Sequence, residues 1–340
     1  MTGPAGKLPI FQIHPTRRCN LTCLHCYSGS GPDVSEVLDV NLVLQGIVDA
    51  AELGYRVLSV SGGEPMLYGP LEQVLSGAHA CGLLTTVTTN GMMLDSRRLR
   101  MLEQHADLVA ISLDGTPESH AEMRASPRAY AAMVRHLPNL RRSGIPFGFI
   151  FTLTFHNVDE LDWVARFAID QGAGLLQIHP LESVGRAQQT LSESVPDLQE
   201  NEYALLEASR LRDQYGDRIQ IQLDLATWRA IHDHPEKVFA DDLDGCQDVS
   251  LAELVAPLVL QTDGVVAPLQ YGFPRRWCLG NLKDARLETL ATTWLQSHYG
   301  PFRTLCREVR DGVLRQPSVP IVNWYSLVHE AAVHREPQTL

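Results

Sequence analysis

The sequence predicts an α/β protein: a partial (β/α)6 TIM-like barrel followed by a smaller C-terminal α/β extension. Short apolar runs rich in β-branched residues alternate with stretches that carry apolar residues at helical spacing, and this alternation continues to about residue 180. Such βα repeats favour a parallel sheet with right-handed crossovers. An open doubly wound sheet is the alternative. In either architecture, ligands bind at the carboxyl ends of the strands.

The first half of the chain accounts for the barrel strands and the helices between them. The expected strands are residues 10–14, 56–61, 84–89, 108–113, 147–153 and 175–179. The expected helices are residues 41–53, 71–81, 96–105, 130–143 and 158–171. Several of the strands are apolar throughout, as expected for strands that are buried on both faces.

Beyond about residue 185 this rhythm changes. A helix is expected over residues 202–215, and strands are expected over residues 219–225 and 258–261. Thr262-Asp263-Gly264 is a turn signal before a last strand at residues 265–269. We therefore expect a core barrel over residues 1–190 and, over residues 191–340, an appended region that is not a seventh repeat.

Composition and charge argue against several classes of protein. The 340 residues are 44% hydrophobic, 20% charged and 7% aromatic, as in a globular protein. Lys and Arg total 28 against 40 Asp and Glu, so the net charge of −12 does not suit a general phosphate binder, and nucleic acid is not an expected partner. No apolar run reaches the roughly 20 residues of a membrane span, and no signal peptide is evident. We expect a cytoplasmic protein with no membrane partner.

Three of the seven cysteines stand close together directly after the first expected strand: Cys19, Cys23 and Cys26. An odd number of cysteines without an export signal argues against a disulfide framework. Soft sulfur ligands select zinc, copper(I) or iron–sulfur clusters. A zinc site needs a fourth ligand, for which His14 or His25 is available. Three cysteines with no fourth nearby better suit a [4Fe–4S] cluster that leaves one iron open.

The triplet Cys19-x3-Cys23-x2-Cys26, with Tyr27 directly after it, resembles the defining motif of the radical S-adenosylmethionine (radical SAM) superfamily. Further segments at the ends of later strands are similar to the family's cofactor-binding segments. They are Ser61-Gly62-Gly63-Glu64-Pro65, Thr88-Thr89-Asn90-Gly91, Ile111-Ser112-Leu113-Asp114-Gly115, Arg124, and Pro180-Leu181 with Gly185-Arg186-Ala187. The similarity covers about residues 9–190.

The resemblance implies a [4Fe–4S] cluster on Cys19, Cys23 and Cys26, with S-adenosylmethionine bound beside it. The cofactor contacts that it implies are Tyr27, Gly62, Gly63, Glu64, Asn90, Ser112, Asp114, Arg124 and Leu181. Glu64 is expected to bind the amino group and Arg124 the carboxylate, while the two glycines let the backbone approach the ligand. For Asp114, capping of a helix that starts near Pro117 is an open alternative.

The resemblance also implies a reaction. One electron, from a donor such as flavodoxin or ferredoxin, cleaves S-adenosylmethionine to methionine and a 5′-deoxyadenosyl radical, which abstracts a hydrogen atom from the substrate. Maturation of a ribosomally made peptide is the implied role, and because the barrel starts by about residue 10, we expect a separate peptide-recognition protein or direct docking. The alternative is a small molecule of cofactor, tetrapyrrole or natural-product biosynthesis. A non-catalytic, metal-stabilised binding scaffold is a third reading.

Residues 261–269, followed by Leu279-Gly280-Asn281-Leu282, resemble the SPASM or twitch extension of many radical SAM enzymes. Leu269 stands where such extensions have a cysteine. The remaining candidates for an auxiliary cluster are the widely spaced Cys246, Cys278 and Cys306. We expect a degenerate extension that keeps its fold without a metal, because a cubane needs about four ligands. A cluster with one non-cysteine ligand stays open as the alternative.

Overall fold

A ten-stranded sheet organises the fold, in the strand order β11-β10-β9-β1-β2-β3-β4-β5-β6-β7. The computed structural model describes residues 8–239 and 249–335. The parallel strands of the barrel are β1 (Ile10–Ile13), β2 (Val57–Val60), β3 (Leu84–Thr89), β4 (Leu108–Ser112), β5 (Phe147–Leu153), β6 (Leu175–Pro180) and β7 (Gln220–Leu223). The partial TIM-like barrel is therefore confirmed.

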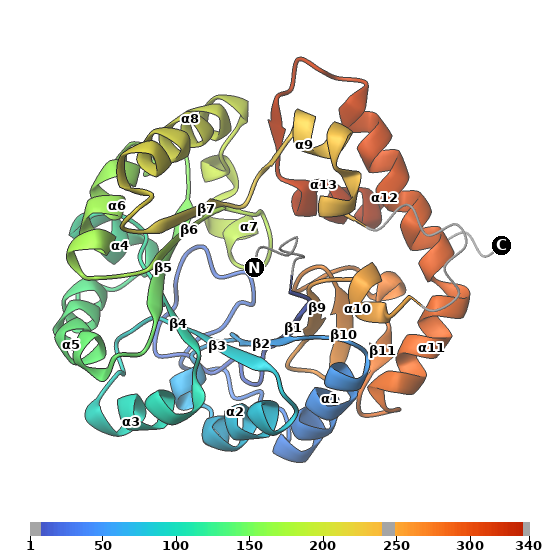
Figure 1. Cartoon of the computed structure of the whole chain (residues 1–340), viewed down its shortest axis with the longest axis horizontal. Helices are drawn as coiled ribbons and strands as arrows, with labels where there is room; N and C mark the ends of the chain where they lie inside the picture. The colour runs from blue at the N-terminus through green and yellow to red at the C-terminus, as the bar shows by residue number, and fades with distance from the viewer. Residues whose placement is uncertain (1–7, 240–248, 336–340) are drawn as a thin grey trace.

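Helices cover the convex side of this curved sheet (Figure 1). They are α1 (Val40–Glu52), α2 (Leu71–Ala80), α3 (Ser96–His105), α4 (Pro117–Met123), α5 (Ala129–Ser143), α6 (Leu161–Asp170) and α8 (Leu198–Tyr215). The short α7 (Ala187–Thr190), after β6, lies on the inner side of the sheet, where Thr190 Oγ1 donates to Leu24 O in the loop after β1. No helix in the two described stretches is both long and apolar enough to cross a membrane.

In the first and sixth strands of the barrel, buried apolar side chains alternate with more accessible side chains. In β1, Phe11 and Ile13 are fully buried, whereas Gln12 between them is only partly buried. The same alternation continues in β6, where Ile178 is fully buried and His179 is not. Because successive side chains of a strand point to opposite faces, the apolar set packs under the helices and the polar set lines the inside of the barrel.

The expectation that the barrel stops at its sixth strand is wrong. After α8, β7 pairs in parallel with β6, with Gln177 opposite Gln222 and Ile178 opposite Leu223. The polar stretch that follows β6 interrupts the βα rhythm in sequence, but α8 still returns the chain to the sheet edge.

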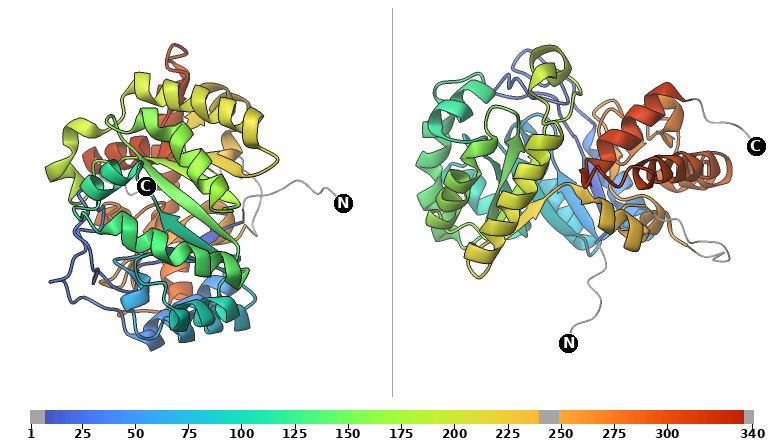
Figure 2. Two further views of the ribbon diagram at one scale, coloured as in Figure 1. Left: turned by 90° about the vertical axis from the view of Figure 1, so that its left-hand side faces the viewer. Right: turned by 90° about the horizontal axis from the view of Figure 1, so that it is seen from above.

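The C-terminal region attaches to both edges of the open barrel. Its elements are β8 (Ala226–Thr227), α9 (Trp228–Asp233), α10 (Leu251–Leu254), β9 (Leu258–Leu260), β10 (Val265–Pro268), β11 (Gly280–Asn281), α11 (Leu287–Ser297), α12 (Tyr299–Leu314), β12 (Ile321–Val322) and α13 (Trp324–His334). At one edge β9 pairs in parallel with β1, and β10 and β11 extend the sheet as an antiparallel hairpin and edge strand. At the other edge β12 pairs with β8, directly after β7. Figures 1 and 2 show α12 running between these two attachments.

A buried carboxylate fixes the C-terminal region to the barrel. Asp49 of α1 is 1% exposed and pairs with Arg286, just before α11. Its Oδ2 also accepts a hydrogen bond from Leu287 N at 3.0 Å, and its Oδ1 accepts one from Gln45 Nε2 at 2.9 Å. Residues more than two hundred positions apart in the chain are thus joined at one carboxylate.

Replacing Arg286 with alanine is expected to lower the free energy of unfolding at pH 7, because it removes the counter-charge of the buried Asp49 carboxylate. The effect is moderate, since the side chain of Arg286 is half exposed and water screens the pair. Burial raises the pKa of Asp49, but hydrogen bonds from Arg286 and Gln45 outweigh it and hold that pKa below its ordinary value. The stabilisation is therefore present at neutral pH and is lost as the pH falls through the acidic range. Urea unfolding between pH 7 and pH 3 measures this, and a difference between wild type and variant that does not narrow contradicts the assignment.

Candidate active site

The three clustered cysteines lie on the loop that follows β1, at the carboxyl ends of the barrel strands. Cys19 and Cys23 are each 8% exposed and share a small apolar cluster with Leu21 and Ala129, against which Cys26 packs. All three are free thiols. Burial first, and then the charges of neighbouring groups that include the other two sulfurs, raise the pKa of Cys19 to about 12. The structure therefore brings the predicted triplet together.

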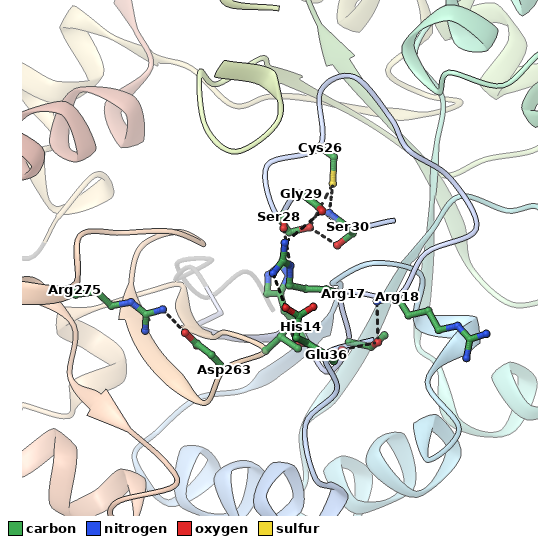
Figure 3. A network of polar contacts seen from close by, with 12 residues as sticks. His14, Arg17, Arg18, Cys26, Ser28, Gly29, Ser30, Glu36, Asp263 and Arg275 are labelled. Atoms are coloured by element: carbon green, nitrogen blue, oxygen red, sulfur yellow. Dashed lines mark hydrogen bonds and ion pairs between the residues drawn. The ribbon is translucent and has the colours of Figure 1, made fainter. Parts of the chain in front are cut away.

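Two arginines hold this loop in place through its backbone. Arg17 donates from Nε to Ser28 O at 2.9 Å and from Nη2 to Gly29 O at 3.3 Å, while its Nη1 pairs with Glu36 (Figure 3). From the far side of the barrel, Arg186 donates to Cys23 O at 2.8 Å and to Ser30 O at 2.7 Å. Arg17 was not among the predicted site residues, because nothing in its sequence context marks it.

Gly62 and Gly63, at the end of β2, let the base of the cysteine loop pack directly on the sheet. Gly63 N donates to Thr16 O at 2.7 Å, and the next amide donates to Arg18 O at 2.9 Å. A Cβ on Gly63 would lie 2.3 Å from Arg18 O, and one on Gly62, where φ is +117°, would lie 2.7 Å from Thr16 O. In this structure the crowding that requires glycine comes from the chain's own loop, and not only from the expected ligand.

Glu64 joins the ends of β2 and β3, and its carboxylate is 1% exposed. Its Oε1 accepts hydrogen bonds from Met66 N at 3.0 Å and from Thr89 Oγ1 at 2.7 Å, and its Oε2 accepts one from Asn90 N at 2.9 Å. Asn90 in turn donates from Nδ2 to Asn20 Oδ1, 2.8 Å away, inside the cysteine loop. Motif residues of two neighbouring strands therefore hold the loop between Cys19 and Cys23.

Asp114 and Arg124 form a buried ion pair beside the cysteines. Arg124 Nε lies 2.5 Å from Asp114 Oδ2, with the two side chains 9% and 0% exposed. Arg124 Nη1 also lies 3.7 Å from Cys23 Sγ. The alternative that Asp114 caps a helix is wrong, because the N-cap of α4 is Thr116, whose N–H is bound by Glu160.

The remaining predicted contacts lie at the same end of the barrel. Tyr27 is 36% exposed, and its hydroxyl lies 3.0 Å from Ser61 Oγ. Its ring packs against Tyr271, 5.7 Å away, which follows the C-terminal hairpin and which the sequence did not mark. Ser112 ends β4 and is partly buried, and Leu181, directly after β6, is 3% exposed.

The C-terminal cysteines have different surroundings. Cys278 is buried, and its thiol lies 3.5 Å from Phe273 O, to which it donates. Burial raises the pKa of Cys278 to about 12, so the group is a neutral thiol. Cys306 is buried within α12, and Cys246 lies outside the described residues. The degenerate extension stays a prediction.

These features define a class of protein: a partial barrel whose first strand leads into three free cysteines, locked onto a Gly-Gly-Glu turn at the end of the second strand. The family model of the radical SAM superfamily matches residues 13–168 of this chain. That range runs from β1 into α6 and contains every site motif described above except Leu181 and its neighbours. The cofactors of this family are a [4Fe–4S] cluster and S-adenosylmethionine.

Sequence relatives fall into two groups by name. An Fe-coproporphyrin III synthase of Methanosarcina barkeri is 28% identical over 215 residues, which cover 62% of this chain and 54% of that protein. The sporulation killing factor maturation protein SkfB of Bacillus subtilis is 25% identical over 256 residues, covering 75% of this chain and 58% of SkfB. The chain thus spans about half the length of the curated relatives that it matches.

A solved structure supports the fold along almost the whole chain. Native anSMEcpe with bound AdoMet and Cp18Cys peptide superposes with a TM-score of 0.65 and covers 95% of this chain and 95% of that one. The sequence identity is 16%, so the likeness concerns the fold.

The cysteine loop fits an iron–sulfur cluster by its donor chemistry. Ser30 N donates to Cys26 Sγ at 3.3 Å, and Arg124 faces Cys23 Sγ. Such N–H donors stabilise cluster thiolates and tune their potential. Since burial keeps the pKa of Cys19 and Cys23 high, a bound metal must supply the positive charge that ionises them. Among the described residues, no three His, Cys, Asp or Glu side chains meet at the spacing of a single metal ion. In a cubane each thiolate binds a different iron, so the three sulfurs need not lie close enough to share one metal ion.

Proposed function

We propose that this chain is a radical SAM enzyme that modifies a peptide. A [4Fe–4S] cluster on Cys19, Cys23 and Cys26 would cleave S-adenosylmethionine reductively to a 5′-deoxyadenosyl radical, which takes a hydrogen atom from the substrate. The observation that carries the proposal is the group of three free thiols, two of them buried and one partly buried, beside the Gly-Gly-Glu turn at the barrel mouth. An electron donor such as flavodoxin or ferredoxin would supply the electron that reduces the cluster.

The protein's own part is to place the cofactor and keep water away. Glu64 Oε1 already accepts two hydrogen bonds, but Oε2 accepts only one and has a lone pair for a further donor, so the amino group of S-adenosylmethionine is proposed to bind at Oε2. Arg124 uses two of its nitrogens on Asp114 and Cys23, and its third nitrogen is proposed to bind the carboxylate. Tyr27, Asn90, Ser112 and Leu181 complete the proposed contacts.

Peptide modification is the first choice among substrates because SkfB is named a maturation protein and the whole chain follows the fold of anSMEcpe, solved with a peptide. The relative named Fe-coproporphyrin III synthase supports a tetrapyrrole as the second candidate. The two classes differ in charge, because a coproporphyrin carries several carboxylates and needs cationic partners.

The class of reaction is tested by incubating the anaerobically reconstituted protein with S-adenosylmethionine and dithionite. We expect 5′-deoxyadenosine at a level well above that of the Cys19/Cys23/Cys26→Ala variant. Equal amounts from both proteins would overturn the proposal. Mass spectrometry of peptides encoded beside the gene, incubated with the same mixture, then tests the substrate class through a mass shift.

A further inference from the structure

A second polar cluster lies inside the barrel, at the ends of β6 and β7. His179 Nδ1 lies 3.1 Å from Asp224 Oδ2, and the two side chains are 40% and 14% exposed. Gln177 Nε2 donates to the same Oδ2 at 2.5 Å, and Gln222 Nε2 donates to Oδ1 at 2.8 Å. Both oxygens of Asp224 therefore accept hydrogen bonds, while the His179 side chain remains 40% exposed.

Glu182 links this cluster to the cysteine loop. Glu182 stands directly after the end of β6 and Leu181, and four residues later Arg186 N donates to Cys26 O at 2.9 Å. The Glu182 carboxylate acts on His179, where burial lowers the pKa but Asp224 and Glu182 outweigh burial and raise it to about 9. Glu182 is only partly buried, so its carboxylate remains accessible to water.

The C-terminal region supplies the other side of this cluster. The pairing of β12 with β8 brings the start of α13 next to the end of β7. Asn323 Nδ2 lies 3.4 Å from Glu182 Oε1, a long hydrogen bond that leaves most of the carboxylate's acceptor capacity free. Burial, then the charges of Asp224 and Glu182, raise the pKa of Tyr325 to about 12, so its phenol is a neutral donor near both carboxylates.

The charge balance of the cluster favours a cation. Two carboxylates, Glu182 and Asp224, face one imidazolium, His179, on this side of the mouth. The nearest arginine in the same loop, Arg186, is directed at the backbone of the cysteine loop. A polycarboxylate would meet net negative charge here, and an amine or guanidinium would meet the accessible oxygens of Glu182.

We propose that Glu182, supported by the His179–Asp224 pair and by Asn323 and Tyr325, is the substrate-recognition group of the barrel, and that it binds an amine or guanidinium of a peptide substrate. This proposal rests on the proposed function, since it names the substrate class of the same site. It places the specificity of the enzyme partly on the C-terminal region, which holds two of the five residues.

The test uses the full-length, anaerobically reconstituted protein with its histidines labelled at 13Cε1, and NMR at pH 7. The His179 signal is assigned by its loss in His179→Gln. The probes are N-acetyl-arginine amide, N-acetyl-glutamate amide and coproporphyrin III. We expect the arginine probe to move the His179 signal, and to move it at least about fivefold less in Glu182→Gln. The matched control, Glu193→Gln, removes an exposed carboxylate from the segment after α7 and should respond like wild type.

A larger response of His179 to the glutamate probe or to coproporphyrin III than to the arginine probe would overturn the proposal. So would an undiminished response to arginine in Glu182→Gln. The comparison of the three probes on the wild-type protein tests the proposal even if a variant folds poorly. The NMR response of His179 does not depend on turnover. The arginine probe can therefore fail to shift the signal while 5′-deoxyadenosine still forms, or can shift it while no 5′-deoxyadenosine forms. The two results test this proposal and the proposed function separately.

Discussion

Replacing Cys23 with alanine is expected to prevent cluster assembly and to reduce 5′-deoxyadenosine formation at least about a thousandfold, or about 4 kcal/mol in the activation free energy. Cys23 is buried beside Arg124 and is one of only three thiols on the loop, so no neighbouring cysteine can replace it. Iron and sulfide per chain after anaerobic reconstitution measure the effect. Iron should fall well below the about four atoms of a single cubane.

Cys81→Ala provides the matched control. Cys81 ends α2 and packs, partly buried, against the core, so its loss is expected to cost about 1 kcal/mol of stability and no iron. Cys278→Ala should also keep about four irons if the C-terminal region holds no second cluster. Full iron content in Cys23→Ala would contradict the ligand assignment. A wild-type content of about eight that falls in Cys278→Ala would instead indicate an auxiliary cluster.

The barrel was predictable from the sequence because its strands and helices differ in composition as well as in periodicity. β5 is almost continuously apolar, and the helices carry apolar residues on one face. The last parallel strand was misassigned for a physical reason. β7 lies at the sheet edge, with Gln220 and Gln222 exposed, so its pattern is that of a peripheral strand.

The site was predictable only where its functional residues lie close together in the sequence, in short motifs. The cysteine triplet and the Gly-Gly-Glu segment are short motifs, and the structure brings them together as expected. The reason for two glycines was only partly anticipated, because their neighbours Thr16 and Arg18 come from the loop after β1, more than forty residues earlier in the chain. The cluster around Glu182 carries no motif: it depends on the pairing of β8 with β12, two strands of two residues each, which are too short for periodicity to indicate.

The Asp114–Arg124 pair illustrates the same limit within a predicted motif. Both residues were expected to contact the cofactor, but their spacing in sequence could not show that they also face each other. In the structure the pair is almost entirely buried, and its guanidinium lies between a carboxylate and a cysteine sulfur. Arg124 is thus placed to act on both the stability of the barrel and the electrostatics of the cysteine loop.

Replacing Asp114 with asparagine is expected to lower the free energy of unfolding by about 3–5 kcal/mol, because it leaves the buried guanidinium of Arg124 without its counter-charge. Burial raises the pKa of Asp114, but Arg124 and two nearby histidines outweigh it and lower that pKa to about 2. The stabilisation is therefore complete above about pH 4, the ordinary value of an aspartate, and is lost as the pH falls towards 2. Anaerobic urea unfolding followed by tryptophan fluorescence measures it.

An exposed pair in the same barrel gives the control for this prediction. Arg166→Gln breaks an ion pair with Asp162 on α6 whose arginine is 65% exposed, and it should cost no more than about 0.5 kcal/mol. The double variant Asp114→Asn/Arg124→Gln should cost less than the sum of its single changes, since removing both charges leaves neither one stranded. Equal costs for Asp114→Asn and Arg166→Gln, or strict additivity in the double variant, would mean that the buried pair does not act as a unit. The coupling energy from this cycle reports the role of Arg124 in stabilising the fold. Its role at the cysteines is measured separately, because loss of the guanidinium beside Cys23 should shift the reduction potential of the reconstituted cluster.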